Sequence, residues 1–210
     1  MQKSKAYEEL LCQINATGAD KLSGYSINIL NSINNNERAE VEKVIWNTFI
    51  YIKDMDIAVL LPKLQLYDGI QALKNTVSEC KIPSYTSMLL CSLIYDNTKE
   101  NEYLKLMEKN IVQSKFDYTY ISILAECHPC EEVYELLVTI YEKPLDRIAC
   151  GSVIDGILYN KGFIKDIDDI EEVSSKKELR IILKNAQKDE KIDMIKKLEN
   201  GEFDNYKNYN

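Results

Sequence analysis

The sequence predicts an all-α protein, built as an α-solenoid of stacked antiparallel helix pairs. Apolar residues recur three and four positions apart along most of the 210 residues, which is typical of amphipathic helices. No segment alternates apolar and polar residues with a period of two, so we expect almost no strand. Apolar positions also repeat after 30 residues, at Leu93, Ile123, Val153 and finally Leu183. Because one helix pair cannot bury its own apolar face, such pairs would stack, although a compact helical bundle is the alternative.

Caps, prolines and glycines predict where the helices begin and end. Asn36 can cap a helix, Pro83 and Pro129 can occupy first turns, and Gly162 can end a helix in the left-handed conformation. The expected helices span 3–15, 21–33, 37–53, a segment that Pro62 kinks or begins and that runs to Cys80, then 83–95, 99–113 after a Thr98 cap, 117–127, 129–142, 144–160, a segment from Asp166 or Asp168 that restarts at Ser175, and 188–199.

This pattern amounts to about ten to twelve helices of ordinary length joined by short turns. We expect residues 1–201 to form a single α-helical repeat domain. Residues 202–210 have no periodic pattern, so we expect a flexible C-terminal tail.

Composition excludes several classes of function. With 26 basic and 34 acidic side chains the formal charge is −8, which argues against a nucleic-acid partner. The chain has one His, which excludes mechanisms that need two, and it has no Gly-rich phosphate loop. The N-terminus has no apolar leader, and the longest apolar run, Ile57 to Leu61, is too short to cross a membrane. We therefore expect a cytoplasmic protein that does not bind membranes.

Between residues 37 and 185, helix length and apolar register resemble α-solenoids of the HEAT type with short repeats of about 30 residues. The size, acidity and scarcity of His also resemble the immunity proteins of bacterial contact-dependent or polymorphic toxin systems. That resemblance implies a non-catalytic cytoplasmic protein that binds a cognate toxin. No individual residue is carried over from it.

The Cys127-His128-Pro129-Cys130 segment is the sharpest motif in the chain. A CxxC pair at a helix start can be a redox site or can contribute ligands to zinc. A redox site of the thioredoxin type follows a strand, and a closed zinc site needs four ligands, so neither context is met. The favoured interpretation is a tight turn between two helices, with no catalytic residue, no metal and no cofactor.

Acidic residues are concentrated in the middle of the chain, where Ile94 to Arg147 contains 11 acidic and six basic residues. An acidic groove there would attract a basic partner, such as a nuclease domain whose own charge serves to hold phosphates. Solubility alone is the alternative explanation of the charge. The 14 Tyr residues suit either a recognition surface or packing between helices.

The sequence thus favours a protein-binding solenoid that neutralises a basic toxin domain. A general interaction adaptor and a metal- or thiol-dependent helical domain are the alternatives. The residues expected to contact the partner are Glu100, Glu108, Tyr118, Glu132, Tyr134, Glu135, Glu142, Asp168 and Asp169.

Overall fold

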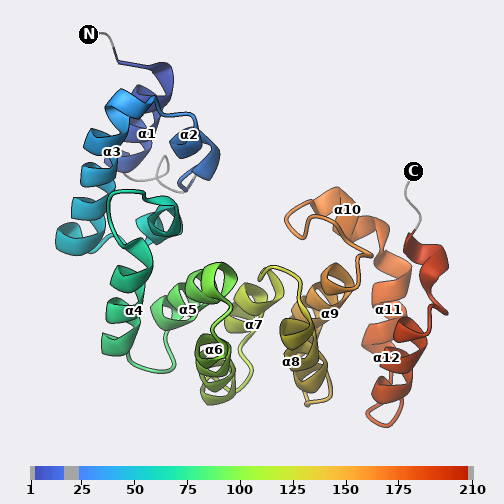
Figure 1. Ribbon diagram of the computed structural model, residues 1–210. Coiled ribbons are helices and arrows are strands. Elements are labelled where there is room, and N and C mark those ends of the chain that lie inside the picture. Colours follow the sequence, from blue (N-terminus) through green and yellow to red (C-terminus); the bar gives the residue numbers. More distant parts are fainter. Residues whose placement is uncertain (1–2, 17–23, 208–210) are drawn as a thin grey trace. The chain divides into compact units, whose positions relative to one another are not determined.

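The computed structural model describes residues 3–16 and 24–207, and within these ranges every regular element is a helix (Figure 1). The all-α prediction is therefore confirmed for the described part of the chain. The chain divides into two compact units, one of residues 1–80 with 93–99 and the other of residues 81–92 with 100–210. The single repeat domain expected over residues 1–201 stays a prediction.

In its described residues, the N-terminal unit contains four α-helices, a π-helix and a 3-10 helix. In order, these are α1 (Lys5–Asn15), α2 (Ile27–Asn31), α3 (Asn35–Asn47), η2 (Thr48–Ile52), η3 (Asp56–Lys63) and α4 (Gly69–Glu79). Helix α5 (Tyr85–Thr98) contributes residues to both units. Pro62 lies inside η3, and α4 starts separately after it, so the single helix expected up to Cys80 is in fact two elements. Gly69 permits this close junction, because a Cβ there would lie 2.0 Å from the carbonyl oxygen of Leu61.

A buried ion pair fixes the core of this unit. Arg38 Nε donates to Glu42 at 2.6 Å, and the carboxylate of Glu42 also accepts the backbone N–H groups of Gln65 and Leu66. The other guanidinium nitrogens of Arg38 donate to backbone carbonyls at the ends of α2 and η3. Glu42 is fully buried, and both partners have their hydrogen bonds satisfied, which is the condition for a buried ion pair to persist.

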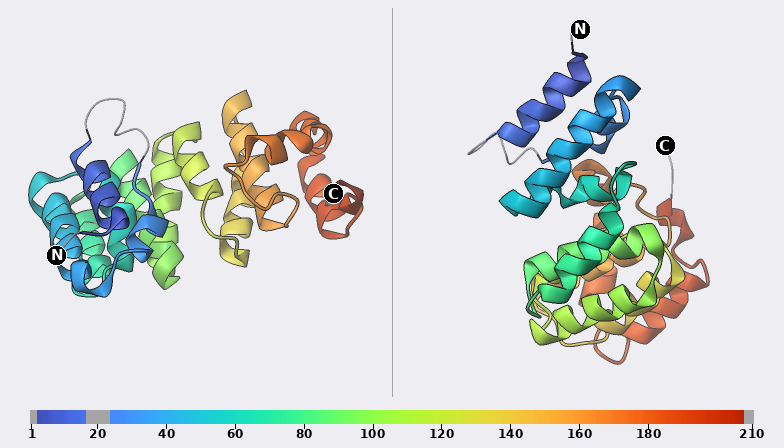
Figure 2. Two further views of the ribbon diagram at one scale, coloured as in Figure 1. Left: turned by 90° about the horizontal axis from the view of Figure 1, so that it is seen from above. Right: turned by 60° about the vertical axis from the view of Figure 1, so that its left-hand side comes forward.

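The C-terminal unit contains the helices that follow α5. They are α6 (Asn101–Gln113), α7 (Tyr118–Ala125), α8 (Glu131–Tyr141), α9 (Arg147–Asn160), α10 (Ile170–Ser175), α11 (Lys177–Asn185), α12 (Lys191–Glu199) and the 3-10 helix η4 (Asp204–Lys207). Helix α9 packs against α7, α8 and α11 (Figure 2).

Helices α7 and α9 run parallel, with an offset close to the 30-residue register seen in the sequence. Ser122 and Ser152 line the same pocket, and Ala125 is the nearest neighbour of Gly156. The parallel arrangement does not continue to α11, because Asp155 contacts Arg180 whereas Gly151, one turn earlier in α9, lies beside Lys184. Helix α11 is therefore antiparallel to α9.

Two asparagines hold the starts of earlier helices in this unit. Asn160, at the end of α9, accepts the N–H of Cys130 through Oδ1 at 3.0 Å and donates to the carbonyl of Gly156 through Nδ2. Asn110 of α6 is fully buried and accepts the N–H of Ser84 in the same way. The first N–H groups of a helix have no partner within the helix, so these amides satisfy groups that burial would otherwise leave unpaired.

Several expected boundaries differ from the structure. The helix expected over 37–53 with Asn36 as its cap begins at Asn35, after the N-cap residue Asn34. Thr98 ends α5 instead of capping α6, and α10 begins after Asp169, whose carboxylate accepts two backbone N–H groups. Residues 21–23 of the expected second helix lie outside the described residues. Residues 202–207, expected as the start of a tail, form a turn and η4, where Lys176 donates to the carbonyl of Tyr206.

Candidate functional site

The exposed face of α8 carries an acidic ridge, which we define as Glu131, Glu132, Glu135 and Glu142. Glu131, Glu135 and Glu142 are spaced by four and seven residues, so they share one stripe of the helix, and Glu132 flanks it. The opposite face is the buried one, formed by Val133, Tyr134, Leu137, Ile140 and Tyr141. The ridge therefore points to solvent from a helix whose other side is fixed in the core.

The acidic ridge lacks compensating cations. Within residues 3–16 and 24–207, the ion pairs engage other carboxylates and none of these four. Glu131 and Glu132 benefit from the positive end of the helix dipole, but Glu142 lies at the C-cap, where a negative charge is unfavourable. Glu131 and Glu135 are a like-charge pair one turn apart, which costs about 0.2–0.5 kcal/mol. The favourable dipole interaction of Glu131 and Glu132, about 0.3–1 kcal/mol each, is large enough to offset these costs, so the ridge is tolerated in the isolated protein.

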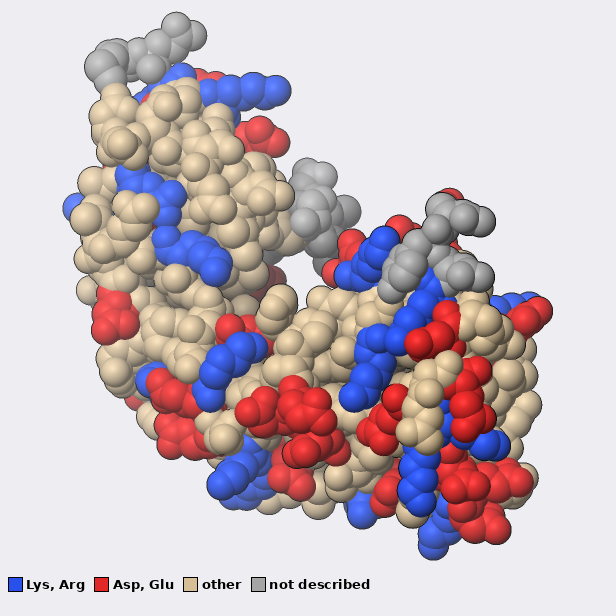
Figure 3. All heavy atoms as spheres, turned by 45° about the vertical axis from the view of Figure 1, so that its right-hand side comes forward, with Lys and Arg blue, Asp and Glu red and all other residues tan. Residues whose placement is uncertain are grey.

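The predicted acids of α6 lie in a different environment. Glu108 is exposed, but Lys105 and Lys109 flank it on the same exposed face, so this surface is mixed in charge. Glu100 is the half-buried N-cap residue of α6. On the face drawn in Figure 3, Asp and Glu side chains form several clusters with Lys and Arg between them, and no continuous acidic groove is visible.

The two predicted tyrosines differ sharply in exposure. Tyr118, the first residue of α7, is 47% exposed and accessible to a partner. Tyr134 is 4% exposed, its hydroxyl donates to Glu199 at 2.9 Å, and Lys161 lies over its ring. The expectation that Tyr134 contacts a partner is therefore corrected, since its surface is used within the fold. Its spacing of seven residues from the buried Tyr141 is the sequence signal that points to this burial.

Asp168 and Asp169 are exposed, in the loop before α10. The carboxylate of Asp169 accepts the N–H groups of Glu171 and Glu172 at 2.9 and 3.0 Å, which makes it the N-cap of α10. Asp168 raises the pKa of Glu126, although the larger cause of that shift is the burial of the Glu126 carboxyl. Asp168 thus lies close to the end of α7, whereas Asp169 has a local structural role.

The CxxC segment forms the connection between α7 and α8. Cys127 is 1% exposed and its thiol donates to the carbonyl of Ile123, while Cys130 is the half-buried N-cap residue of α8. In the described part of the chain, none of the six cysteines is assigned to a disulfide. Among the described residues, no group of three or more His, Cys, Asp or Glu side chains is arranged to hold a metal ion. The turn between two helices that the sequence favoured is what the structure contains at this point.

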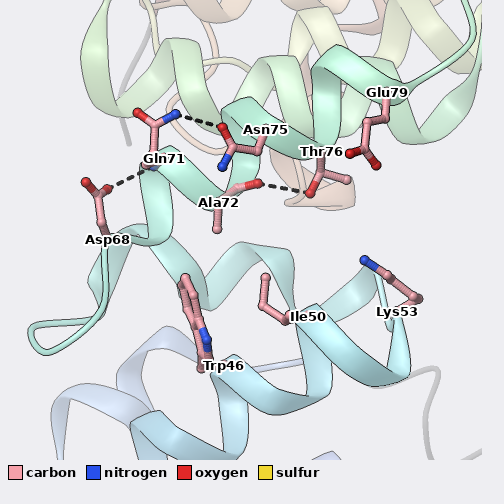
Figure 4. Close-up of a pocket in the computed structure, with 9 residues that line it drawn as sticks. All are labelled: Trp46, Ile50, Lys53, Asp68, Gln71, Ala72, Asn75, Thr76 and Glu79. Carbon is pink, nitrogen blue, oxygen red and sulfur yellow. Dashed lines mark hydrogen bonds between the residues drawn. The ribbon is translucent and has the colours of Figure 1, made fainter.

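A groove in the N-terminal unit was not anticipated from the sequence. It has a volume of about 310 Å³ and lies between α3 and η2 on one side and α4 on the other (Figure 4). Trp46, Ile50 and Lys53 line it from one side, and the other lining residues come from Asp68 and α4. Trp46 stacks on Tyr67 with ring centroids 4.9 Å apart. The only feature of the sequence that could have indicated this site is the single Trp. Its position does not reveal that α4 residues would line the same groove.

The polar groups of this Trp46 groove are largely committed to α4 itself. Asp68 caps the helix by accepting the N–H of Gln71, Gln71 donates to Asn75, and Thr76 donates to the carbonyl of Ala72 (Figure 4). Neither Cys nor His is among the nine lining residues. The groove therefore offers an aromatic wall and amide groups, which suits noncovalent binding.

The carboxyl of Asp155, on α9, also has a shifted pKa. Burial raises the pKa of Asp155, and the guanidinium of Arg180 opposes that shift. Arg180 Nη2 donates to Asp155 at 2.9 Å, and its Nε lies 2.6 Å from the other carboxylate oxygen. This arrangement joins α9 to α11 and has the geometry of a structural ion pair.

No helix in the described part of the chain is both long and apolar enough to span a membrane. Comparisons with protein-family models, with curated proteins and with solved structures found no match to this chain.

Proposed function

We propose that this chain is a non-catalytic binding protein that neutralises a cognate bacterial toxin, as an immunity protein does. The partner would be a basic protein domain, and the acidic ridge of α8 would contact it. The observation that carries the proposal is that Glu131, Glu132, Glu135 and Glu142 lie together on a solvent-facing surface without an ion-pair partner among the described residues. A basic partner would supply the missing counter-charges.

The physical advantage of such a ridge is fast and selective association. Uncompensated charge on a rigid helix attracts an oppositely charged domain over about 8–10 Å at physiological ionic strength. It also disfavours acidic partners, because like charges repel. A toxin that cleaves nucleic acid has a basic active-site surface to hold phosphates, so a row of carboxylates is complementary to it. Neutralisation would then be stoichiometric occlusion of that surface, without turnover.

A HEAT-like solenoid is part of this proposal. The parallel stacking of α7 on α9, with α8 packed between their ends, supports a repeat of helix pairs in this part of the chain. In such an array the outer helices present one face to solvent along their full length. The acidic ridge on α8 is a face of this kind.

The test is binding of the full chain to a panel of basic toxin domains, measured by calorimetry at low and high salt. We expect nanomolar affinity that weakens as salt rises. The variant Glu131→Lys/Glu135→Lys should bind at least tenfold more weakly, since two attractive contacts become repulsive.

The matched control is Glu8→Lys/Glu9→Lys, which changes the net charge by the same amount on the exposed side of α1. This control should bind like the wild type. Equal affinity of the two charge-reversed proteins, or binding that ignores salt, would remove the acidic ridge from the proposal. Growth of cells that co-express the toxin domain and the chain is the functional readout, and loss of rescue by the α8 variant alone is the expected result.

A further inference from the structure

A basic pocket in the C-terminal unit is not used by the proposed function. It has a volume of about 550 Å³ and lies where the start of α9 meets the end of α11 and the start of α12. Arg147, Lys184 and Lys191 line it, one from each of these helices. Three cations around one cavity are unusual in a chain with a formal charge of −8. The basic pocket therefore concentrates charge opposite to that of the protein.

Within the described residues, Arg147, Lys184 and Lys191 form no ion pair with a carboxylate. Asp146 also lines the basic pocket, but its Oδ1 accepts the N–H groups of Ile148 and Ala149 at 2.7 and 2.9 Å, so it serves as the N-cap of α9. The carboxylates of Asp146 and Asp155 offset part of the repulsion among the three cations, but the lining of the basic pocket keeps an excess of positive charge. A bound anion would relieve the remaining repulsion.

The lysines of the basic pocket are partly ordered before any ligand binds. The ammonium of Lys191 donates to the backbone carbonyls of Tyr141 and Lys143 and lies over the ring of Tyr141. An ammonium has three donors, so one remains for a ligand. Lys184 Nζ lies against Gly151, where a Cβ would be 3.8 Å away. Groups held in place in advance lose less conformational entropy on binding.

The two ammonium groups act on the same buried thiol, that of Cys150. The net shift of the Cys150 pKa is upward, because burial disfavours the thiolate, but Lys191 and Lys184 both act in the opposite direction. Cys150 is 6% exposed and lines the basic pocket. Both charges are therefore close to the same point on the pocket wall.

We propose that this basic pocket binds a small molecule that carries a phosphate group. A phosphate monoester has close to two negative charges and three acceptor oxygens, which matches three separate cationic groups better than one carboxylate does. The Asn185 amide supplies a further polar group, and Leu145 and Ile181 give an apolar wall for the organic part of the ligand. A volume of about 550 Å³ lies within the range of small-molecule sites and exceeds what phosphate alone needs.

The experiment titrates the full-length protein with inorganic phosphate, phenyl phosphate and benzoate, followed by calorimetry and by NMR of the side-chain signals. Phenyl phosphate should bind most tightly, inorganic phosphate more weakly and benzoate weakest. Tighter binding of inorganic phosphate than of phenyl phosphate would assign the basic pocket to the free ion and overturn the ester. Failure of both phosphates to bind would overturn the proposal entirely.

Matched variants localise the binding. Lys184→Gln and Arg147→Gln should each weaken binding of phenyl phosphate by about tenfold, the usual size of one lost charge-assisted hydrogen bond. Lys177→Gln is the control, because it removes the same charge from the exposed start of α11, outside the basic pocket. Equal affinities of the Lys184 and Lys177 variants would overturn the site. This test is independent of the α8 ridge, since binding of a phosphate ester needs no protein partner.

Discussion

Gly156 of α9 lies so close to Ala125 of α7 that a Cβ atom at Gly156 would be 2.7 Å from the Cβ of Ala125. The same Cβ would be 3.0 Å from Cδ1 of Leu137 on α8. The absence of a side chain at this position therefore lets three helices meet.

Replacing Gly156 by Ala should destabilise the C-terminal unit. Alanine favours a helix by about 0.5–1 kcal/mol relative to glycine, but overpacking a tight interface costs about 1–3 kcal/mol, so the net effect is a loss. Gly151→Ala in the same helix is the matched control, because its Cβ would meet only Lys184 Nζ at 3.8 Å. We expect this control to be neutral or slightly more stable in urea unfolding followed by circular dichroism. Stabilisation by both substitutions would contradict the packing of α9 on α7.

Removal of the buried charge at Glu42 should have a large effect on the N-terminal unit. Glu42→Gln leaves the guanidinium of Arg38 buried without its counter-charge, and breaking a pair of this kind costs about 3–5 kcal/mol. Glu40→Gln, on the exposed side of α3, removes the charge from a solvent-exposed ion pair with Lys3 and should cause a much smaller loss. The double variant Arg38→Met/Glu42→Leu should recover part of the stability, because no unpaired charge remains. Equal losses for Glu42→Gln and Glu40→Gln would show that the pair has little structural role.

Alkaline pH should weaken the fold through buried tyrosines. Burial raises the pKa of Tyr141, whose hydroxyl donates to the carbonyl of Leu183. The unfolded chain releases this proton near pH 10, whereas the folded protein retains it, so the unfolded state binds fewer protons and stability falls as pH rises above about 10. Burial raises the pKa of Tyr25 and Tyr134 in the same direction.

The measurement is urea unfolding at a series of pH values from about 8 to 11. Tyr141→Phe should lower stability near neutral pH by about 0.5–1.5 kcal/mol through the lost hydrogen bond. The variant should then show a shallower decline at alkaline pH. An identical slope in the wild type and in Tyr141→Phe would argue that this hydroxyl does not retain its proton.

The protein purified without chelator should contain less than about a tenth of an equivalent of zinc, and a chelator should leave its unfolding midpoint unchanged. The reason is that the Cys127 thiol is buried and donates to a backbone carbonyl within its own turn. Stoichiometric zinc, lost together with stability on chelation, would restore the metal-dependent alternative. Cys127→Ser with Cys130→Ser would then identify the ligands.

Sequence patterns predicted a helix well where the helix has a local apolar repeat or a capping residue. Apolar spacing identified α8 and its buried stripe, and Gly162 ends α9 with a φ of 71°, as its type suggested. The same spacing places Tyr134 on the buried stripe of α8. Tyr134 was nevertheless expected to contact a partner, because tyrosine is common at recognition surfaces. The exposure of Glu132, Glu135 and Glu142 followed from the polar face of the same helix.

The Trp46 groove and the basic pocket could not be predicted in this way. Their lining residues come from helices that are not adjacent in sequence, and no local pattern states which helix ends will meet. In the sequence, nothing distinguishes Arg147, Lys184 and Lys191 from other surface residues. They line one pocket only because α11 packs antiparallel to α9. The break expected at Ser175 lies at the end of α10, but the direction of α11 follows only from the tertiary contacts of Arg180 and Lys184 with α9.

For this protein, the sequence by itself determined that the chain is helical, which face of each amphipathic helix is apolar, and where its acidic residues concentrate. These properties follow from interactions within a few residues, such as helix periodicity and capping. The tertiary structure decided which helices pack in parallel, which tyrosine is buried and which charges share a cavity, because these depend on close contacts between distant segments. The meeting of Gly156 with Ala125 is one such contact.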